Sequence, residues 1–275
     1  MDIRGAVVDL DGTVYRGGRL LDGAREGVEA LRDGGIDCLF VTNNPTRSPE
    51  AYAERLGSLG LHVRPEQVCS AGSLTATYLA EHHATDDVFL IGSDGLREMV
   101  ADADVRTTDD PDAADVVVTS HTYDFDYDDL TEGLWALDGA DAFVGTDPDL
   151  TYPGEDGRDR PGSGAITRAV ATVAERAPDH VLGKPSEETL DIVRERLGHP
   201  LDRCLVVGDR PDTDVALGKR GGMTTVLVLS GTTTRTDVDL DGETPRLVAP
   251  VEGDLDPDFV VDGLGDLPTV LHGVV

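Results

Sequence analysis

The sequence predicts an α/β fold with a parallel sheet, and two observations indicate it. Short β-branched runs alternate with helical patterns at the start of the chain, and the same alternation returns towards its other end. Consecutive parallel strands need a long crossover, usually a helix, so this alternation is typical of parallel sheets. We therefore expect both ends of the chain to contribute strands to one sheet.

The expected elements follow from these runs. At the start they are strands at 3–10 and 36–42, and helices at 22–34 and 48–60. Near the other end they are strands at 180–185, 203–210 and 224–229, and helices at 186–197 and 212–220. Apolar and β-branched residues are frequent in the expected strands at 3–10, 36–42, 203–210 and 224–229, as is typical of strands.

The middle of the chain carries another alternating set. It predicts helices at 73–83, 127–137 and 163–176, and strands at 87–92, 115–120 and 141–146. This set is large enough to form a domain of its own. We therefore expect a first domain from residues 1–70 and 180–275, and a second domain, residues 71–179, inserted into it.

The composition is strongly acidic. There are 54 acidic and 23 basic residues, a formal charge of −31, and lysine occurs only as Lys184 and Lys219. This is typical of a protein from a salt-rich cytoplasm, where screening relieves self-repulsion. The charge disfavours nucleic acid and anionic lipid as partners.

No targeting or membrane-spanning segment is recognisable, and three scattered cysteines fit reduced structural thiols, so we expect a soluble cytoplasmic protein.

In an open parallel sheet, ligands bind beyond the carboxyl ends of the strands, so polar residues there are candidates. Asp9 and Asp11 end the first strand, and their i, i+2 spacing places both carboxylates on one side. Such a pair favours a cation, and Mg²⁺ prefers a few carboxylates and a phosphate. Gly12 lets the chain turn sharply away. The alternative is a strand that ends in an Asx turn.

Three further residues follow the strand at 36–42 or end it. Thr42 offers a hydroxyl, and Asn43 and Asn44 offer amides, which can contact phosphate oxygens or cap a turn.

Lys184 lies at the end of another predicted strand, at 180–185. In a chain where arginine is the usual cation, Lys184 indicates a need for a compact ammonium charge, with a solvated surface lysine as the alternative.

The motif GDRPDTD follows the strand at 203–210. One acidic residue could be explained as a helix N-cap, but three are not easily explained that way. Asp209 comes directly after the strand and is expected to bind the cation opposite Asp9. Asp212 and Asp214 are expected to orient metal-bound waters or the lysine.

These motifs resemble those of the haloacid dehalogenase superfamily, which match DLDGT, Thr42, Lys184 and GDRPDTD in order. The chain is more closely similar to its class IIA, NagD-like or p-nitrophenylphosphatase-like, members. The resemblance implies a Rossmann-like catalytic core, residues 1–70 and 180–275, with an inserted α/β cap domain, residues 71–179, that sets substrate specificity.

The resemblance also implies a mechanism. Asp9 would attack phosphorus and form an aspartyl-phosphate, while Asp11 would act as general acid and then general base. Mg²⁺ would be bound by the Asp9 side chain, the Asp11 backbone carbonyl and Asp209. Thr42 and Lys184 would bind the transferring phosphoryl group.

Further implied contacts lie in loops. Gly12, Asn43 and Asn44 are expected near the phosphate. The segment 145–153 resembles a cap loop that faces the active site, so Asp147 is a candidate substrate contact, with loop capping as the alternative. Pro211 departs from the usual larger apolar residue, and we expect only a local packing change.

The expected function is therefore Mg²⁺-dependent hydrolysis of a small-molecule phosphate ester, with a possible homodimer through the cap. A phosphomutase could share all four motifs. Hydrolytic dehalogenation would need neither Asp11 nor Asp209, and a phosphate-binding protein without activity would not need every catalytic position filled. The sequence does not distinguish nucleotides, phosphoglycolate or glycerol phosphate as substrates.

Overall fold

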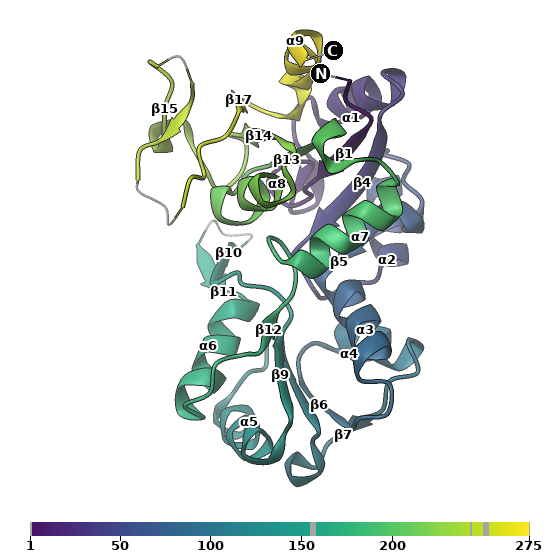
Figure 1. Cartoon of the computed structure of the whole chain (residues 1–275), viewed down its shortest axis with the longest axis vertical. Coiled ribbons are helices and arrows are strands. Elements are labelled where there is room, and N and C mark those ends of the chain that lie inside the picture. The colour runs from purple at the N-terminus through teal and green to yellow at the C-terminus, as the bar shows by residue number, and fades with distance from the viewer. Residues whose placement is uncertain (1, 155–157, 243, 250–252, 275) are drawn as a thin grey trace. The chain divides into compact units, whose positions relative to one another are not determined.

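The computed structural model describes residues 2–154, 158–242, 244–249 and 253–274 (Figure 1). The chain divides into two compact units. The first consists of residues 1–42, 52–69 and 189–275, and the second of residues 43–51 and 70–188. Each unit has a sheet and a core of its own.

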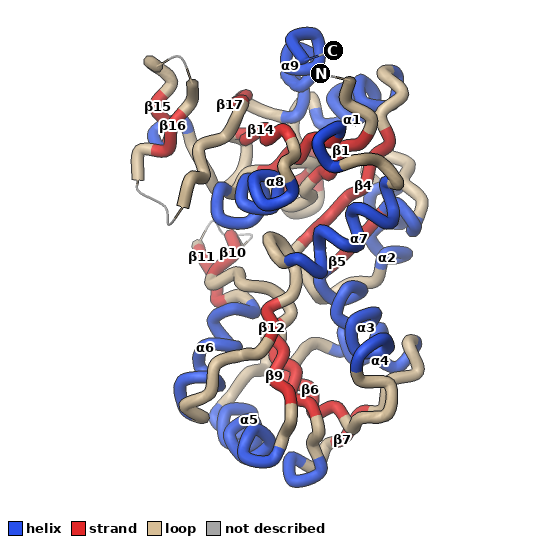
Figure 2. Tube along the Cα trace, in the orientation of Figure 1, coloured by secondary structure: helices blue, strands red, loops and turns tan. Residues whose placement is uncertain are grey.

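The first unit is built on a six-stranded sheet in the order β17-β14-β13-β1-β4-β5 (Figure 2). The strands are β1 (Gly5–Val8), β4 (Asp37–Thr42), β5 (Val68–Ser70), β13 (Cys204–Gly208), β14 (Thr224–Val228) and β17 (Phe259–Val261). β1 lies between β13 and β4 and runs parallel to both, with Val8 opposite Val207 and Phe40. The prediction that both ends of the chain share one parallel sheet is confirmed.

Helices and short hairpins complete this unit. They are the helices α1 (Ala24–Asp33), α2 (Pro49–Ser58), α7 (Glu187–Leu197), α8 (Ala216–Gly221) and α9 (Leu267–Val274), and the hairpins β2 (Tyr15–Arg16) with β3 (Arg19–Leu20) and β15 (Val238–Asp239) with β16 (Arg246–Leu247). α1 buries Val28 and Leu31 in the core that contains Val8 and Phe40. Apolar residues spaced three apart lie on one helical face, which is why α1 packs with this face inwards.

The second unit contains a five-stranded parallel sheet in the order β12-β9-β8-β6-β7. Its elements are α3 (Ala71–His82), β6 (Val88–Ile91), α4 (Asp94–Asp102), β7 (Thr107–Thr108), β8 (Val116–Thr119), α5 (Tyr127–Gly139), β9 (Ala142–Gly145), the hairpin β10 (Thr151–Pro153) with β11 (Asp159–Pro161), α6 (Ser163–Val173) and β12 (His180–Val181). Phe89, Val117 and Phe143 on the strands pack with Ala136 and Val170 from α5 and α6.

One expected strand joins a different sheet. We expected residues 180–185 to extend the sheet of the chain ends, but β12 pairs with β9 instead. Asp179 explains the pairing, because its backbone N–H donates to the Phe143 carbonyl at 2.8 Å and its carboxylate accepts from the Phe143 N–H at 2.8 Å. These contacts place the chain beside β9 just before β12 begins.

The helix expected at 212–220 is also different in detail. It begins with a π-helical turn, Pro211–Val215, and continues as α8. Proline is tolerated in the first turn of a helix because its missing N–H has no intrahelical partner there. The wide turn directs Asp214 inwards, and its side chain is buried.

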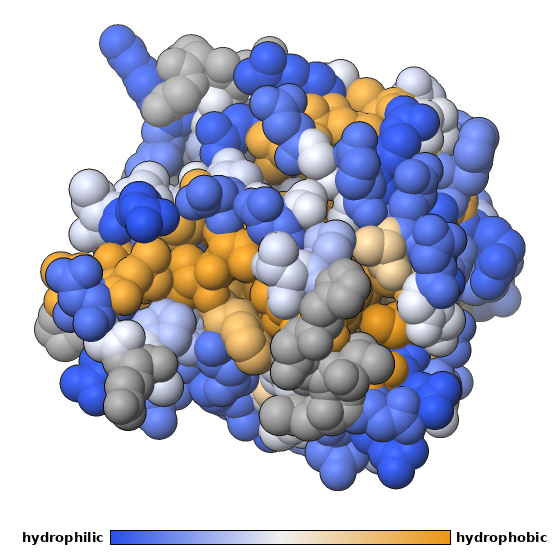
Figure 3. All heavy atoms as spheres, turned by 90° about the horizontal axis from the view of Figure 1, so that it is seen from above, coloured by the Kyte–Doolittle hydropathy of each residue, from blue (hydrophilic) through white to orange (hydrophobic). Residues whose placement is uncertain are grey.

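On the face shown in Figure 3, hydrophilic residues surround an area of hydrophobic ones. Cys38, Cys69 and Cys204 are all buried, and burial raises the pKa of the Cys38 and Cys204 thiols to about 11. Among the described helices, we find none with the length and apolar character that crossing a bilayer requires.

Candidate active site

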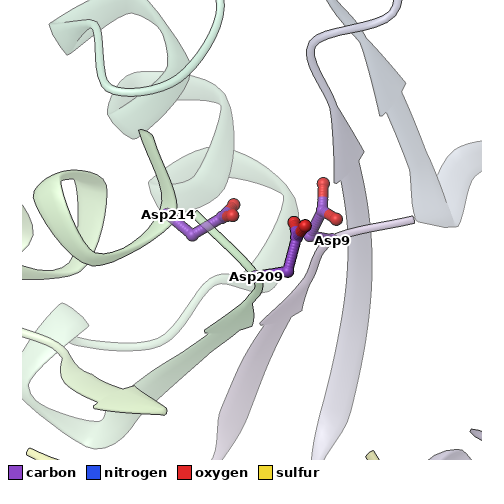
Figure 4. A group of neighbouring side chains, drawn as sticks. All are labelled: Asp9, Asp209 and Asp214. Carbon is purple, nitrogen blue, oxygen red and sulfur yellow. The ribbon is translucent and has the colours of Figure 1, made fainter. Parts of the chain in front are cut away.

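Three buried carboxylates meet at one edge of the first unit's sheet. Asp9 follows β1 and Asp209 follows β13, and because these strands are parallel neighbours, their carboxyl ends lie together. Asp214 comes from the π-helical turn that follows. One carboxylate oxygen of each residue lies within 4.8 Å of the others, and the three side chains are buried. Figure 4 shows the carboxyl groups of Asp9 and Asp209 side by side, with Asp214 directed towards them.

The loop after β14 holds Asp209 in place. The Thr232 N–H donates to Asp209 Oδ2 at 2.5 Å, and the Thr233 hydroxyl donates to the Asp209 carbonyl at 2.6 Å. Gly12 and Gly231 lie against the same carboxylate, and a Cβ at Gly12 would approach Asp209 Oδ2 to 2.6 Å. A Cβ at Gly231 would overlap that oxygen. The close approach of two backbone segments therefore encloses Asp209.

The two aspartates expected to orient waters or the lysine lie in different settings. Asp214 is only 2% exposed and accepts from the Arg210 N–H at 3.1 Å. Asp212 is exposed and forms an ion pair with the Arg210 guanidinium at 3.2 Å. Of the two, Asp214 is therefore the one that can contribute a carboxylate directly to the cluster.

Asp11 is exposed beside the cluster, where a tyrosine contacts it. The Tyr15 hydroxyl donates to Asp11 Oδ2 at 3.0 Å. Burial, reinforced by the negative charge of Asp11, raises the pKa of Tyr15 above its ordinary value, so the phenol keeps its proton and stays a donor. The guanidinium of Arg55 lies 4.6 Å from the centre of the Tyr15 ring. This cation–π contact also holds the tyrosine ring.

The remaining predicted residues of the β4 end divide between the two units. Thr42 ends β4 in the first unit and is 3% exposed, and β4 is the other neighbour of β1. Asn43 begins the second unit. Both donors of its side-chain amide are used, by the Lys184 carbonyl at 3.1 Å and Asp149 Oδ1 at 3.3 Å. Its side-chain amide is therefore engaged within the second unit, and a contact of Asn43 with a phosphate stays a prediction.

Asn44 and Lys184 also belong to the second unit. The Asn44 side-chain oxygen accepts from the Thr46 N–H at 3.1 Å and the Thr46 hydroxyl at 2.7 Å, which is the turn-capping arrangement. Lys184 follows β12 and is 2% exposed, so it is not a solvated surface cation. Lys219, in contrast, forms an ion pair with Asp258 at 2.9 Å on a partly exposed surface.

Asp147 is a buried carboxyl in the loop after β9. It accepts from the Thr146 hydroxyl at 3.0 Å and from the Asp149 N–H at 3.2 Å. Burial, together with the nearby negative charge of Asp149, raises its pKa to about 8. These contacts match the loop-capping alternative, and a contact of Asp147 with substrate stays a prediction.

Among the described residues, the cluster of Asp9, Asp209 and Asp214 fits a hard divalent cation. Carboxylate oxygens are the ligands that Mg²⁺ prefers. The sequence placed Tyr15 only in a segment, residues 15–18, that resembles the short flap after the first motif, and sequence reasoning missed Arg55, the contact of Tyr15 with Asp11 and the loop that holds Asp209. The signal for that loop was the run SGTTT directly after a predicted strand, since small and hydroxyl residues at a strand end allow close backbone approach.

The chain matches known protein families and relatives in sequence. A family model described as "Haloacid dehalogenase-like hydrolase" matches residues 6–106, and a second HAD-like hydrolase model matches residues 181–267. The sugar-phosphatase AraL of Bacillus subtilis is 32% identical over 263 residues, which is 96% of this chain and 91% of that protein. The 5'-nucleotidase YutF of the same organism is 33% identical, over 88% of this chain and 93% of that protein.

Solved structures show the same similarity. A p-nitrophenyl phosphatase from Archaeoglobus fulgidus superposes with a TM-score of 0.87 at 35% identity, covering 98% of this chain and all of that one. A 4-nitrophenylphosphatase from Thermotoga maritima superposes with a TM-score of 0.85 at 30% identity, over 98% and 97% of the two chains.

Proposed function

Because the chain belongs to the haloacid dehalogenase-like hydrolases and is a phosphatase of that family, we propose that it hydrolyses a small-molecule phosphate monoester with Mg²⁺ through an aspartyl-phosphate on Asp9. The observation that carries the proposal is the cluster of Asp9, Asp209 and Asp214 at the carboxyl ends of two adjacent strands. This is where ligands bind in open parallel sheets.

The cluster would hold Mg²⁺ through the carboxylates of Asp9, Asp209 and Asp214, with the backbone carbonyl of Asp11 as a further ligand. When bound, the ion supplies positive charge that neutralises the phosphoryl oxygens. The Thr232 N–H, together with Gly12 and Gly231, keeps the Asp209 carboxylate in one orientation. This metal ligand is therefore positioned before the ion binds.

The proposed first half-reaction uses both aspartates of the first motif. An Asp9 carboxylate oxygen attacks phosphorus, and the bond between phosphorus and the ester oxygen breaks. Asp11 gives its proton to that leaving oxygen, so the alcohol departs neutral. Asp9 is then an acyl phosphate and Asp11 is a carboxylate.

In the second half-reaction, Asp11 takes a proton from water, and the water oxygen attacks the phosphorus of the acyl phosphate. Inorganic phosphate leaves, and both aspartates return to their starting states. The Tyr15 hydroxyl donates to Asp11 and fixes the direction of its carboxyl group. Asp212 is proposed to orient water, as expected from the sequence.

Two further groups are proposed to bind the phosphoryl oxygens. Thr42 would contribute its hydroxyl, and Lys184 its ammonium, whose burial removes competing water. The backbone N–H groups near Gly12, Asn43 and Asn44 would complete the contacts. For the substrate, similarity to a sugar-phosphatase, a 5'-nucleotidase and a p-nitrophenyl phosphatase supports sugar phosphates, nucleotides and aryl phosphates as candidates.

The proposal is tested by release of p-nitrophenol from p-nitrophenyl phosphate, with Mg²⁺ and with a chelator, in about 1 M KCl. We expect Asp9→Asn to lower kcat by about a thousandfold or more, as loss of a nucleophile does elsewhere. Asp191→Asn is the matched control, because Asp191 forms an exposed ion pair with Arg194. Acid quenching of wild type should trap phosphate on the protein, and Asp9→Asn should trap none.

Equal rates for wild type and Asp9→Asn would refute the mechanism, and activity that survives chelation would refute the metal requirement. Retention of the phosphate on an isomeric product, without release of inorganic phosphate, would identify a phosphomutase instead. A wild-type protein that binds phosphate esters without turnover would identify a binding protein.

A further inference from the structure

The side chain of Asn43 forms hydrogen bonds that connect its own segment to two others in the second unit, those of Lys184 and Asp149. Its Oδ1 accepts from the Lys184 N–H at 2.7 Å, and its Nδ2 donates to the Lys184 carbonyl at 3.1 Å. The same Nδ2 donates to Asp149 Oδ1 at 3.3 Å. Asn43 is 6% exposed, so water competes little for these bonds. One amide therefore engages both backbone groups of a single residue.

The backbone beside Lys184 is shaped to receive this amide. Gly183 has φ +69°, a conformation that favours glycine, and a Cβ there would lie 2.9 Å from Asn43 Oδ1 and 3.0 Å from Asp147 Cβ. Asn43 and Asp147 thus both lie directly against Gly183. The close packing leaves the Lys184 backbone little freedom to shift or rotate.

The position of a buried lysine side chain depends on its backbone more than that of an exposed lysine does. Lys184 is 2% exposed, and its four-carbon side chain starts from the backbone that Asn43 holds. A displacement of about 1 Å at a catalytic group can lower a rate about a hundredfold. The position of the Lys184 backbone therefore sets where its ammonium can lie.

We propose that Asn43 is a positioning residue that acts through Lys184. Its amide fixes the Lys184 backbone, so that the lysine ammonium is placed to contact the phosphoryl group. The inference rests on the proposed function of Lys184. It requires both a donor and an acceptor on the side chain at this position, because the Asn43 amide accepts from the Lys184 N–H and donates to its carbonyl. Asp in its place could accept but not donate, and its charge would face the Asp149 carboxylate.

The test is a double-mutant cycle on kcat and KM for p-nitrophenyl phosphate. In the wild-type background we expect Asn43→Asp to lower kcat about 10- to 100-fold, as loss of an orienting partner does. In a Lys184→Met background the same change should alter kcat less than about twofold, because the group that Asn43 positions is gone. A merely structural asparagine would lower kcat by the same factor in both backgrounds.

Gln67→Glu is the matched control. The Gln67 side-chain amide also bonds two backbone groups. Its Oε1 accepts from the Arg64 N–H at 3.2 Å and its Nε2 donates to the Cys38 carbonyl at 3.4 Å. We expect this variant to keep wild-type kcat, whereas a loss as large as that of Asn43→Asp would overturn the inference. If Asn43→Asp does not fold, as judged by thermal unfolding, Asn43→Ala passes through the same cycle.

The outcomes separate this inference from the proposed function. Turnover that depends on Asp9, combined with equal effects of Asn43→Asp in both backgrounds, would refute the positioning role alone. Turnover that does not depend on Asp9 would refute the proposed function.

Discussion

The buried carboxyl of Asp147 predicts a stability contribution that falls as the pH rises. Burial and the facing Asp149 charge raise its pKa from the ordinary 3.8 to about 8, despite hydroxyl groups from Thr146 and Ser163 that favour the ionised form. The folded state therefore holds this proton where the unfolded chain has lost it. The contribution is fully present below the unfolded pKa and is lost as the pH rises through the folded pKa.

The magnitude follows from the two pKa values. Each pH unit between them changes the free energy of unfolding by about 1.4 kcal/mol. Between about pH 5 and about pH 8 the loss is thus roughly 4 kcal/mol. Asp147→Asn removes the titration while keeping a neutral group of the same shape. We expect the variant to match wild type within about 1 kcal/mol near pH 4, and to be the more stable protein at pH 8.

The assay is urea unfolding of both proteins over this pH range at constant high salt, with the difference in free energy plotted against pH. Taking the difference cancels the titration of the many other carboxylates, which both proteins share. Asp102→Asn, at the exposed end of α4, is the control for removing a carboxylate that lies outside the buried loop. A flat difference for Asp147→Asn, or one that favours wild type as the pH rises, would refute the reasoning.

Two further predictions concern the metal site and the charge. Gly231→Ala places a Cβ on Asp209 Oδ2, so we expect Mg²⁺ affinity, measured by calorimetry, to fall about 10- to 100-fold, and unchanged affinity would contradict the close approach. With a net charge of −31, the wild-type urea midpoint should rise between about 0.1 M and about 1 M KCl, as the Debye length falls from about 10 to about 3 Å. A midpoint that stays constant with salt would show that self-repulsion does not limit stability.

Much of the first unit could be predicted because its signals are local. The strands that became β1, β4, β13 and β14 are continuous apolar runs, and parallel pairing brings their carboxyl ends to one edge. The sequence therefore predicts that Asp9 and Asp209 lie near each other, as they do in the structure. α4 was missed because its apolar residues, Leu96, Met99 and Val100, are few and follow a strand closely.

Other features depend on long-range contacts. β12 is only two residues long, so its choice of sheet rests on the Asp179 contacts with Phe143 rather than on its own residues. The inward direction of Asp214 follows from the π-helical turn, which the spacing of the motif does not encode. The roles of Lys184, Thr42 and Asp147 toward substrate remain predictions.

By itself the sequence determined the fold class, the strand ends that carry aspartate, and the unusual charge, because these depend on residue type and local period. Only the tertiary structure decided which of the acidic residues in GDRPDTD approaches Asp9, which loop holds Asp209, and that the Asn43 amide holds the Lys184 backbone. Each of these joins residues distant in the sequence or depends on a turn geometry, so it follows from how the packed backbone brings polar atoms within hydrogen-bonding distance.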